Sequence, residues 1–141
     1  MSERIGHIRY TIHHRRAFRD IERKFFGRVS LRGYLHDLDK VLLYPIFGVK
    51  LTNKIHRCFA RHHVRKARTG VDYREMVIDW ECARYTKPDK PLNAYDTLYH
   101  LYPQLESKIL PILKELGIDH HTESKGAGWP IGRPATWCPL P

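Results

Sequence analysis

Apolar residues recur every three or four positions along most of this 141-residue chain, and no stretch alternates as a half-buried strand would. Residues 3–26 contain no proline and carry isoleucines at this spacing, which predicts a long first helix. Further helices are predicted over 30–48, which ends near Pro45 and Gly48, over 51–68, and from Asp72, Asn93 and Pro103 onward. The pattern therefore predicts an all-α protein of five to six helices.

The periodic pattern stops at Gly117, and residues 118–141 differ in composition. Three glycines, four prolines and two tryptophans occur there without periodicity. A chain of this length has room for one core. We therefore expect one helical domain over 1–117, followed by an irregular tail over 118–141 that Trp129 or Trp137 could anchor to the domain or to a partner.

The net charge of +10 is concentrated in the first half of the chain. Residues 1–70 hold 17 Lys and Arg against 5 Asp and Glu, whereas residues 71–141 hold 8 against 10. A basic surface attracts nucleotides, nucleic acid or other polyanions. A solvated helix face that only keeps the protein soluble explains the same charge, and the charge alone does not separate these two interpretations.

Several classes of protein are disfavoured. No stretch approaches the ~20 consecutive apolar residues of a membrane span, and Met1 to Tyr10 lack the apolar core of a secretory signal. Cys58, Cys82 and Cys138 are odd in number and widely separated, which indicates free thiols in a reducing compartment. These features predict a cytoplasmic protein.

The dipeptide His36-Asp37, inside the second predicted helix, carries the clearest chemical signal. Neighbouring side chains on a helix point about 100° apart and can bind adjacent positions around one ion. Imidazole together with carboxylate suits divalent Mn, Fe, Co, Ni, Zn or Mg. A lone His-Asp pair is common on protein surfaces, but further residues of ligand type lie on other predicted helices: His14, His56, His62, His63 and Asp79.

The order His, His-Asp, His and His, then Asp resembles the HD-domain superfamily of metal-dependent phosphohydrolases, and in particular small phage and bacterial proteins of this type. Four segments carry the resemblance: Tyr10 to Arg15, His36 to Lys40, His56 to His63 and Glu75 to Trp80. It covers about residues 10–85 and leaves the C-terminal third unexplained. The resemblance implies one compact, all-helical HD-type domain with a metal site.

The resemblance also implies the primary metal ligands, which are His14, His36, Asp37 and Asp79. His14 is preferred to His13 because it lies four residues after Tyr10 and four before Phe18, and so shares a helix face with both.

The number of ions depends on the third predicted helix. His56 and His63 would lie about 10 Å apart on an unbroken helix, too far to share one ion, while His62 would point toward the core. The superfamily includes both mononuclear members and binuclear members with extra histidines in this region. One ion, or two bridged by Asp37, are both compatible with the sequence, and at least one of the three histidines is expected to be a core or surface residue.

Basic residues near the predicted ligands could contact a substrate. Lys40 follows Asp37 by three residues, so it could pair with Asp37, and the resemblance implies a contact with a substrate phosphate. Further cations that could neutralise the phosphate are Arg15, Arg61 and Arg65.

Two carboxylates near the predicted ligands, Glu75 and Asp39, each fit more than one role. Glu75 could orient or deprotonate water, but its spacing from Asp72 favours a capping box. Asp39 is expected to face solvent, with acid–base work or a water contact as the alternatives.

These parts predict a phosphohydrolase that acts on a nucleotide or another small phosphorylated compound through metal-activated water. Some HD-type proteins use the same ligand order in binuclear-iron oxygenases, which gives one alternative. A non-enzymatic protein that binds nucleic acid or another polyanion is the other. A phage-encoded protein of this kind would work in the host cytoplasm.

Overall fold

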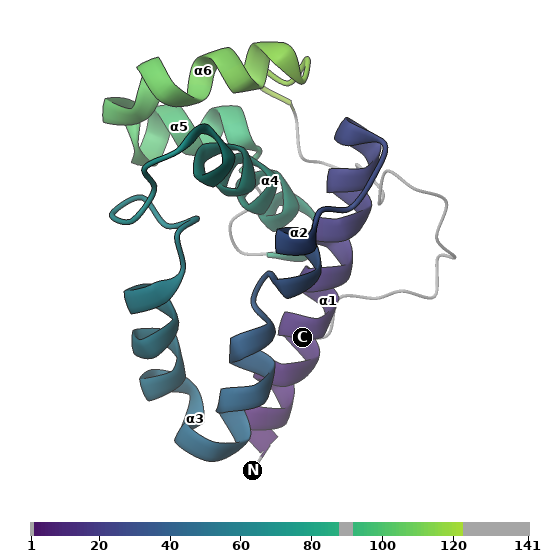
Figure 1. The fold of residues 1–141 in the computed structure, drawn as a ribbon, viewed down its shortest axis with the longest axis vertical. Helices are drawn as coiled ribbons and strands as arrows, with labels where there is room; N and C mark the ends of the chain where they lie inside the picture. The colour runs from purple at the N-terminus through teal and green to yellow at the C-terminus, as the bar shows by residue number, and fades with distance from the viewer. Residues whose placement is uncertain (1, 88–91, 123–141) are drawn as a thin grey trace. The chain divides into compact units, whose positions relative to one another are not determined.

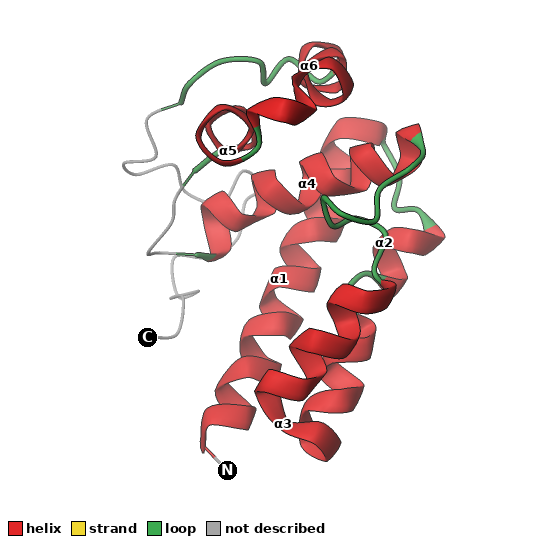
Figure 2. Cartoon of the chain, turned by 90° about the vertical axis from the view of Figure 1, so that its left-hand side faces the viewer, coloured by secondary structure: helices red, strands yellow, loops and turns green. Residues whose placement is uncertain are grey.

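A computed structural model describes residues 2–87 and 92–122, and its regular elements in those ranges are all helices (Figures 1 and 2). The all-α prediction is confirmed. The chain forms two compact units, 1–67 and 68–141, so the predicted domain over 1–117 includes the first unit and the helices of the second. Of the predicted tail, residues 118–122 contain no helix, and both tail tryptophans lie outside the described residues.

No helix in the described part of the chain is both long enough and apolar enough to cross a membrane.

Helix α1 spans Ser2–Phe26, as the first segment predicted. Its buried face carries residues three or four positions apart, namely Thr11, His14, Phe18 and Ile21. Ile5 and Ile12, which belong to the same periodic pattern, are exposed. The helix therefore buries a histidine at a position where an aliphatic side chain would be the usual choice.

The second predicted helix is broken at the His-Asp dipeptide. Helix α2 covers only Leu31–Leu35, and Ser30 caps it by accepting a hydrogen bond from the Gly33 N–H. Asp37 then adopts a left-handed backbone conformation (φ 53°, ψ 15°), which Asp tolerates better than most residues. The prediction that His36 and Asp37 lie inside one continuous helix was wrong, because this turn separates α2 from the next helix.

Helix α3, Leu38–Phe59, folds back on itself at Gly48, so that its two halves run side by side (Figure 1). The predicted break near Gly48 is confirmed. Gly48 has φ 71° and ψ 177°, a conformation that is essentially restricted to glycine. The Tyr44 hydroxyl donates a hydrogen bond to Asn53 Oδ1 (3.1 Å) across the two halves.

Gly48→Ala is expected to lower the free energy of unfolding by about 1–3 kcal/mol, which is the cost of a non-glycine residue in this backbone region. The new Cβ would meet Arg4 side-chain atoms at no less than 3.5 Å, so the cost is backbone strain and not a clash. Urea denaturation measures the change. Gly6→Ala is the matched control. Gly6 is an exposed residue of α1 with open space around it, so this substitution should stabilise the helix slightly. If both substitutions changed the free energy of unfolding equally, the backbone conformation assigned to Gly48 would be wrong.

Over residues 68–87 and 92–122, the second unit contains four elements: α4 Gly70–Thr86, α5 Ala94–Leu101, the 3₁₀ helix η1 Pro103–Leu105 and α6 Glu106–Glu115. Helix α4 begins earlier than predicted, because the capping box pairs Thr69 with Asp72 and not Asp72 with Glu75. The predicted cap at Asn93 is confirmed by its hydrogen bond from the Asp96 N–H.

Candidate metal centre

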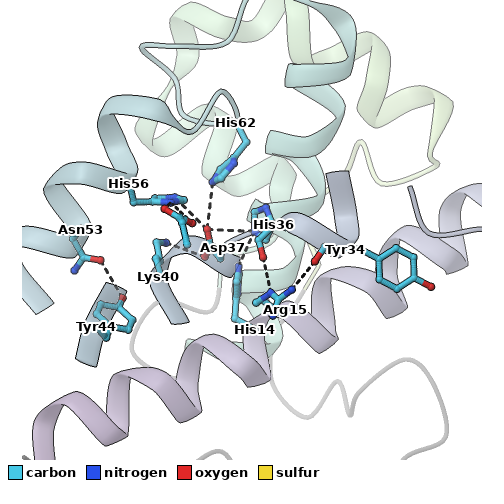
Figure 3. Close-up of polar contacts among 11 residues, drawn as sticks. His14, Arg15, Tyr34, His36, Asp37, Lys40, Tyr44, Asn53, His56 and His62 are labelled. Atoms are coloured by element: carbon cyan, nitrogen blue, oxygen red, sulfur yellow. Dashed lines mark hydrogen bonds and ion pairs between the residues drawn. The ribbon is translucent and has the colours of Figure 1, made fainter. Parts of the chain in front are cut away.

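Three imidazole nitrogens surround one oxygen of Asp37 (Figure 3). Asp37 Oδ1 lies 3.1 Å from His56 Nε2, 3.8 Å from His62 Nε2 and 3.9 Å from His36 Nε2. His14 Nε2 lies a further 3.4 Å from His36 Nε2. All five side chains are buried, and all belong to the first unit. The structure thus brings together five residues predicted as ligands, from α1, the α2–α3 turn, the second half of α3 and the segment after α3.

The histidines that follow α3 are close together because the helix ends before them. The prediction of a helix over 51–68 was wrong beyond Phe59, since Ala60 is extended (φ −69°, ψ 120°) and His62 and His63 lie in the turns that follow. The ring centroids of His56 and His63 are 5.0 Å apart, and those of His62 and His63 are 4.4 Å apart. One nitrogen from each of the three lies within 4.8 Å of the others, so all three could contact a single ion.

The backbone around His36 is fixed by α1. The Arg15 guanidinium donates hydrogen bonds to the carbonyl oxygens of His36 (2.7 Å) and Tyr34 (2.5 Å). Phe18 stacks on the His36 ring at a centroid distance of 3.9 Å. Burial, and then the positive charge of Arg19, lower the pKa of Arg15. Arg15 therefore holds the His-Asp turn, and its contact with a substrate phosphate stays a prediction.

Lys40 contacts one oxygen of Asp37 and leaves the other facing the histidines. Its Nζ donates a hydrogen bond to Asp37 Oδ2 at 2.8 Å, which confirms the expected ion pair. The other oxygen, Oδ1, is the one surrounded by imidazoles. The contact of Lys40 with a substrate phosphate stays a prediction.

Asp39 contacts a histidine, although the sequence favoured a solvent-facing role. Its side chain is 43% exposed, yet both carboxylate oxygens lie close to His56 Nδ1, at 2.8 and 3.0 Å. Burial acts most strongly, to raise the pKa of Asp39, but hydrogen bonds from the His56 ring and from the Lys40 backbone act the other way, and the net pKa is lowered. The carboxylate therefore accepts a hydrogen bond from the Nδ1–H group of His56.

The environment of His56 tests whether a metal fits. Its Nε2 is buried and makes no hydrogen bond, even though Asp37 Oδ1 lies only 3.1 Å away. If a proton lay between His56 Nε2 and Asp37 Oδ1, their contact would be expected to have hydrogen-bond geometry at this distance. The arrangement instead leaves the Nε2 lone pair available beside a carboxylate oxygen and other imidazoles. Neutral imidazole and carboxylate are the ligands that divalent transition metals prefer, so the donor set fits such an ion.

The remaining predicted residues belong to both units, two to the first and two to the second. Arg61 and Arg65 are exposed and flank the histidines after α3. Asp79 and Glu75 lie on α4 in the second unit, where Asp79 is half-buried and Glu75 is buried in the second turn, outside the capping box. The role of Asp79 as a ligand and that of Glu75 as a base stay predictions.

Comparisons of this chain with protein-family models, with curated proteins and with solved structures gave no match. The resemblance to HD domains rests on the order and spacing of residues.

Proposed function

We propose that this protein is a metal-dependent phosphohydrolase that acts on a nucleotide or another small phosphorylated compound. One observation carries the proposal: Asp37 Oδ1 lies within 3.9 Å of three imidazole Nε2 atoms, while Lys40 holds the other oxygen. The order of the ligand-type residues, which resembles that of HD phosphohydrolases, supports the same function.

The residues that would hold the metal are His14, His36, Asp37, His56 and His62, with His63 and Asp79 as further ligands for one or two ions. A bound divalent ion supplies a lowered pKa for water and polarises a phosphoryl oxygen. Iron, manganese, cobalt, nickel, zinc and magnesium are the candidate metals.

Lys40 and the exposed arginines would bind the substrate. An ammonium group has three donors, so Lys40 can hold Asp37 and a phosphate oxygen together. The Lys40 side chain is 18% exposed and can be reached from solvent. Arg61 and Arg65 would neutralise further phosphate charge, which favours a small substrate with more than one anionic group.

Metal content and phosphate release test this proposal. The purified protein is analysed for bound metals, stripped with a chelator, and assayed with nucleoside triphosphates, deoxynucleoside triphosphates, cyclic dinucleotides and guanosine tetraphosphate, each with Mn, Co, Ni or Mg. We expect phosphate release or phosphodiester cleavage that disappears on chelation and returns with one of these metals.

Three outcomes would contradict the proposal. One is metal binding without hydrolysis of any substrate in the panel. Another is tightly bound iron with an oxygen-sensitive visible spectrum, which would favour the oxygenase. The last is salt-dependent polyanion binding, without hydrolysis, that persists fully in the His36→Ala/Asp37→Ala double variant, which would favour the non-enzymatic binding protein.

A further inference from the structure

We infer that Asp39 is a positioning residue that fixes the tautomer of His56, so that His56 presents an unprotonated Nε2 to the metal. The inference rests on the proposed metal centre and assigns Asp39 a role outside the ligand set. Asp39 lies at the start of α3 and His56 near its end, 17 residues later.

The hydrogen bond between Asp39 and His56 determines which ring nitrogen carries the proton. Both oxygens of Asp39 lie within 3.0 Å of His56 Nδ1. An ionised carboxylate can only accept hydrogen bonds, so the proton lies on Nδ1. A neutral imidazole has one N–H, and its other nitrogen then carries a lone pair. The contact with Asp39 thereby makes Nε2 the nitrogen that can bind a metal.

The surroundings of Nε2 argue against a purely ionic role for His56. A doubly protonated ring bridging Asp39 and Asp37 would also explain the short distances on both sides. That arrangement would bury an Nε2 proton, and Nε2 makes no hydrogen bond although it is buried. A proton on Nε2 would have no acceptor in hydrogen-bond geometry in a residue that is 2% exposed, whereas a lone pair on Nε2 can bind a metal.

The contact with Asp39 also orients the His56 ring. Each ring nitrogen contacts a different carboxylate: Nδ1 lies 2.8 Å from Asp39 Oδ2, and Nε2 lies 3.1 Å from Asp37 Oδ1. Hydrogen-bonded carboxylates behind metal-binding histidines orient the ring and raise its basicity, and their removal typically costs 10–100-fold in metal affinity.

Metal affinity of the full chain tests the inference. Zn²⁺ dissociation constants are measured by competition with a chromogenic chelator for wild type, Asp39→Ala, Asp39→Asn and Asp39→Glu. We expect about 10–100-fold weaker binding for Asp39→Ala. Asp39→Asn keeps an oxygen acceptor and should lose less, and Asp39→Glu should recover part of the loss. Asp119→Ala, which removes an exposed carboxylate in the second unit, is the control and should bind as wild type does.

Nitrogen-15 NMR of labelled histidines supplies a second readout, independent of activity. In the metal-free wild type, His56 should carry its proton on Nδ1, and it should retain that proton when Zn²⁺ binds. In Asp39→Ala the two tautomers should mix. Thermal melting of the metal-free variants checks that they fold.

The possible failures are distinguishable. Wild-type affinity in Asp39→Ala, or a His56 ring protonated on both nitrogens, would overturn the role of Asp39 while leaving the centre in place. Coordination of Zn²⁺ through His56 Nδ1 would mean that Nδ1 carries no proton for Asp39 to accept in a hydrogen bond, and it would also overturn that role. A wild-type protein that binds no metal would overturn the inference and the proposed centre together, whereas metal binding without hydrolysis would overturn only the proposed activity.

Discussion

Asp37→Asn is expected to lower metal-dependent phosphate release by about 1000-fold, since a metal supplies several kcal/mol of charge stabilisation and each 1.36 kcal/mol is a factor of ten. The substitution removes the negative charge at the point where three imidazoles meet. Asparagine has almost the same size and also tolerates the left-handed backbone found at this position. The fold should therefore survive, and the loss should be chemical.

Bound metal and kcat/KM measure this effect, with circular dichroism as the check on folding. The matched control is Asp119→Asn, which makes the same chemical change at an exposed site. A folded Asp37→Asn protein with the metal content and activity of the wild type would exclude Asp37 as a ligand.

Phe18→Ala is expected to lower the free energy of unfolding of the metal-free protein by about 3–5 kcal/mol, the usual cost of emptying a buried aromatic site. Phe18 is 1% exposed and packs directly on the His36 ring. Loss of this stacking contact should also let the His36 ring move, so metal affinity should fall together with the free energy of unfolding.

Denaturant unfolding with and without metal separates the two effects. Phe59→Ala is the control, because Phe59 is 79% exposed and its truncation should change stability little. If Phe18→Ala and Phe59→Ala had the same free energy of unfolding, the placement of Phe18 in the core of the first unit would be wrong.

Features set by local sequence could be predicted well. Helix α1, the cap at Asn93 and the end of α6 before Gly117 follow from periodicity and end signals, which depend on a few neighbouring residues. The break at Asp37 could not be predicted, since the apolar spacing continues through it. Arg15, on a different helix, bonds to the two carbonyls of that turn, and such tertiary contacts override local propensity.

The candidate site shows the same division. His14 was preferred to His13 from helix geometry, and the structure places it 3.4 Å from His36. Nothing in the sequence paired Asp39 with His56, because they lie on two separately predicted helices and the periodic pattern does not specify how those helices are oriented. The glycine-dependent reversal at Gly48 brings them together, and only its approximate position was visible in the sequence.

Because α3 folds back on itself, the chain entropy that is lost in bringing the metal-binding side chains together is lost during folding and not during metal binding. Closing a flexible loop of the 17 residues that separate Asp39 from His56 would cost about 2.5 kcal/mol by the logarithmic dependence on loop length. Here two helical arms joined at one glycine close that loop as the chain folds. A metal ion that binds at the proposed centre would therefore meet donors that are already close together, and none of its binding energy would be needed to close this loop.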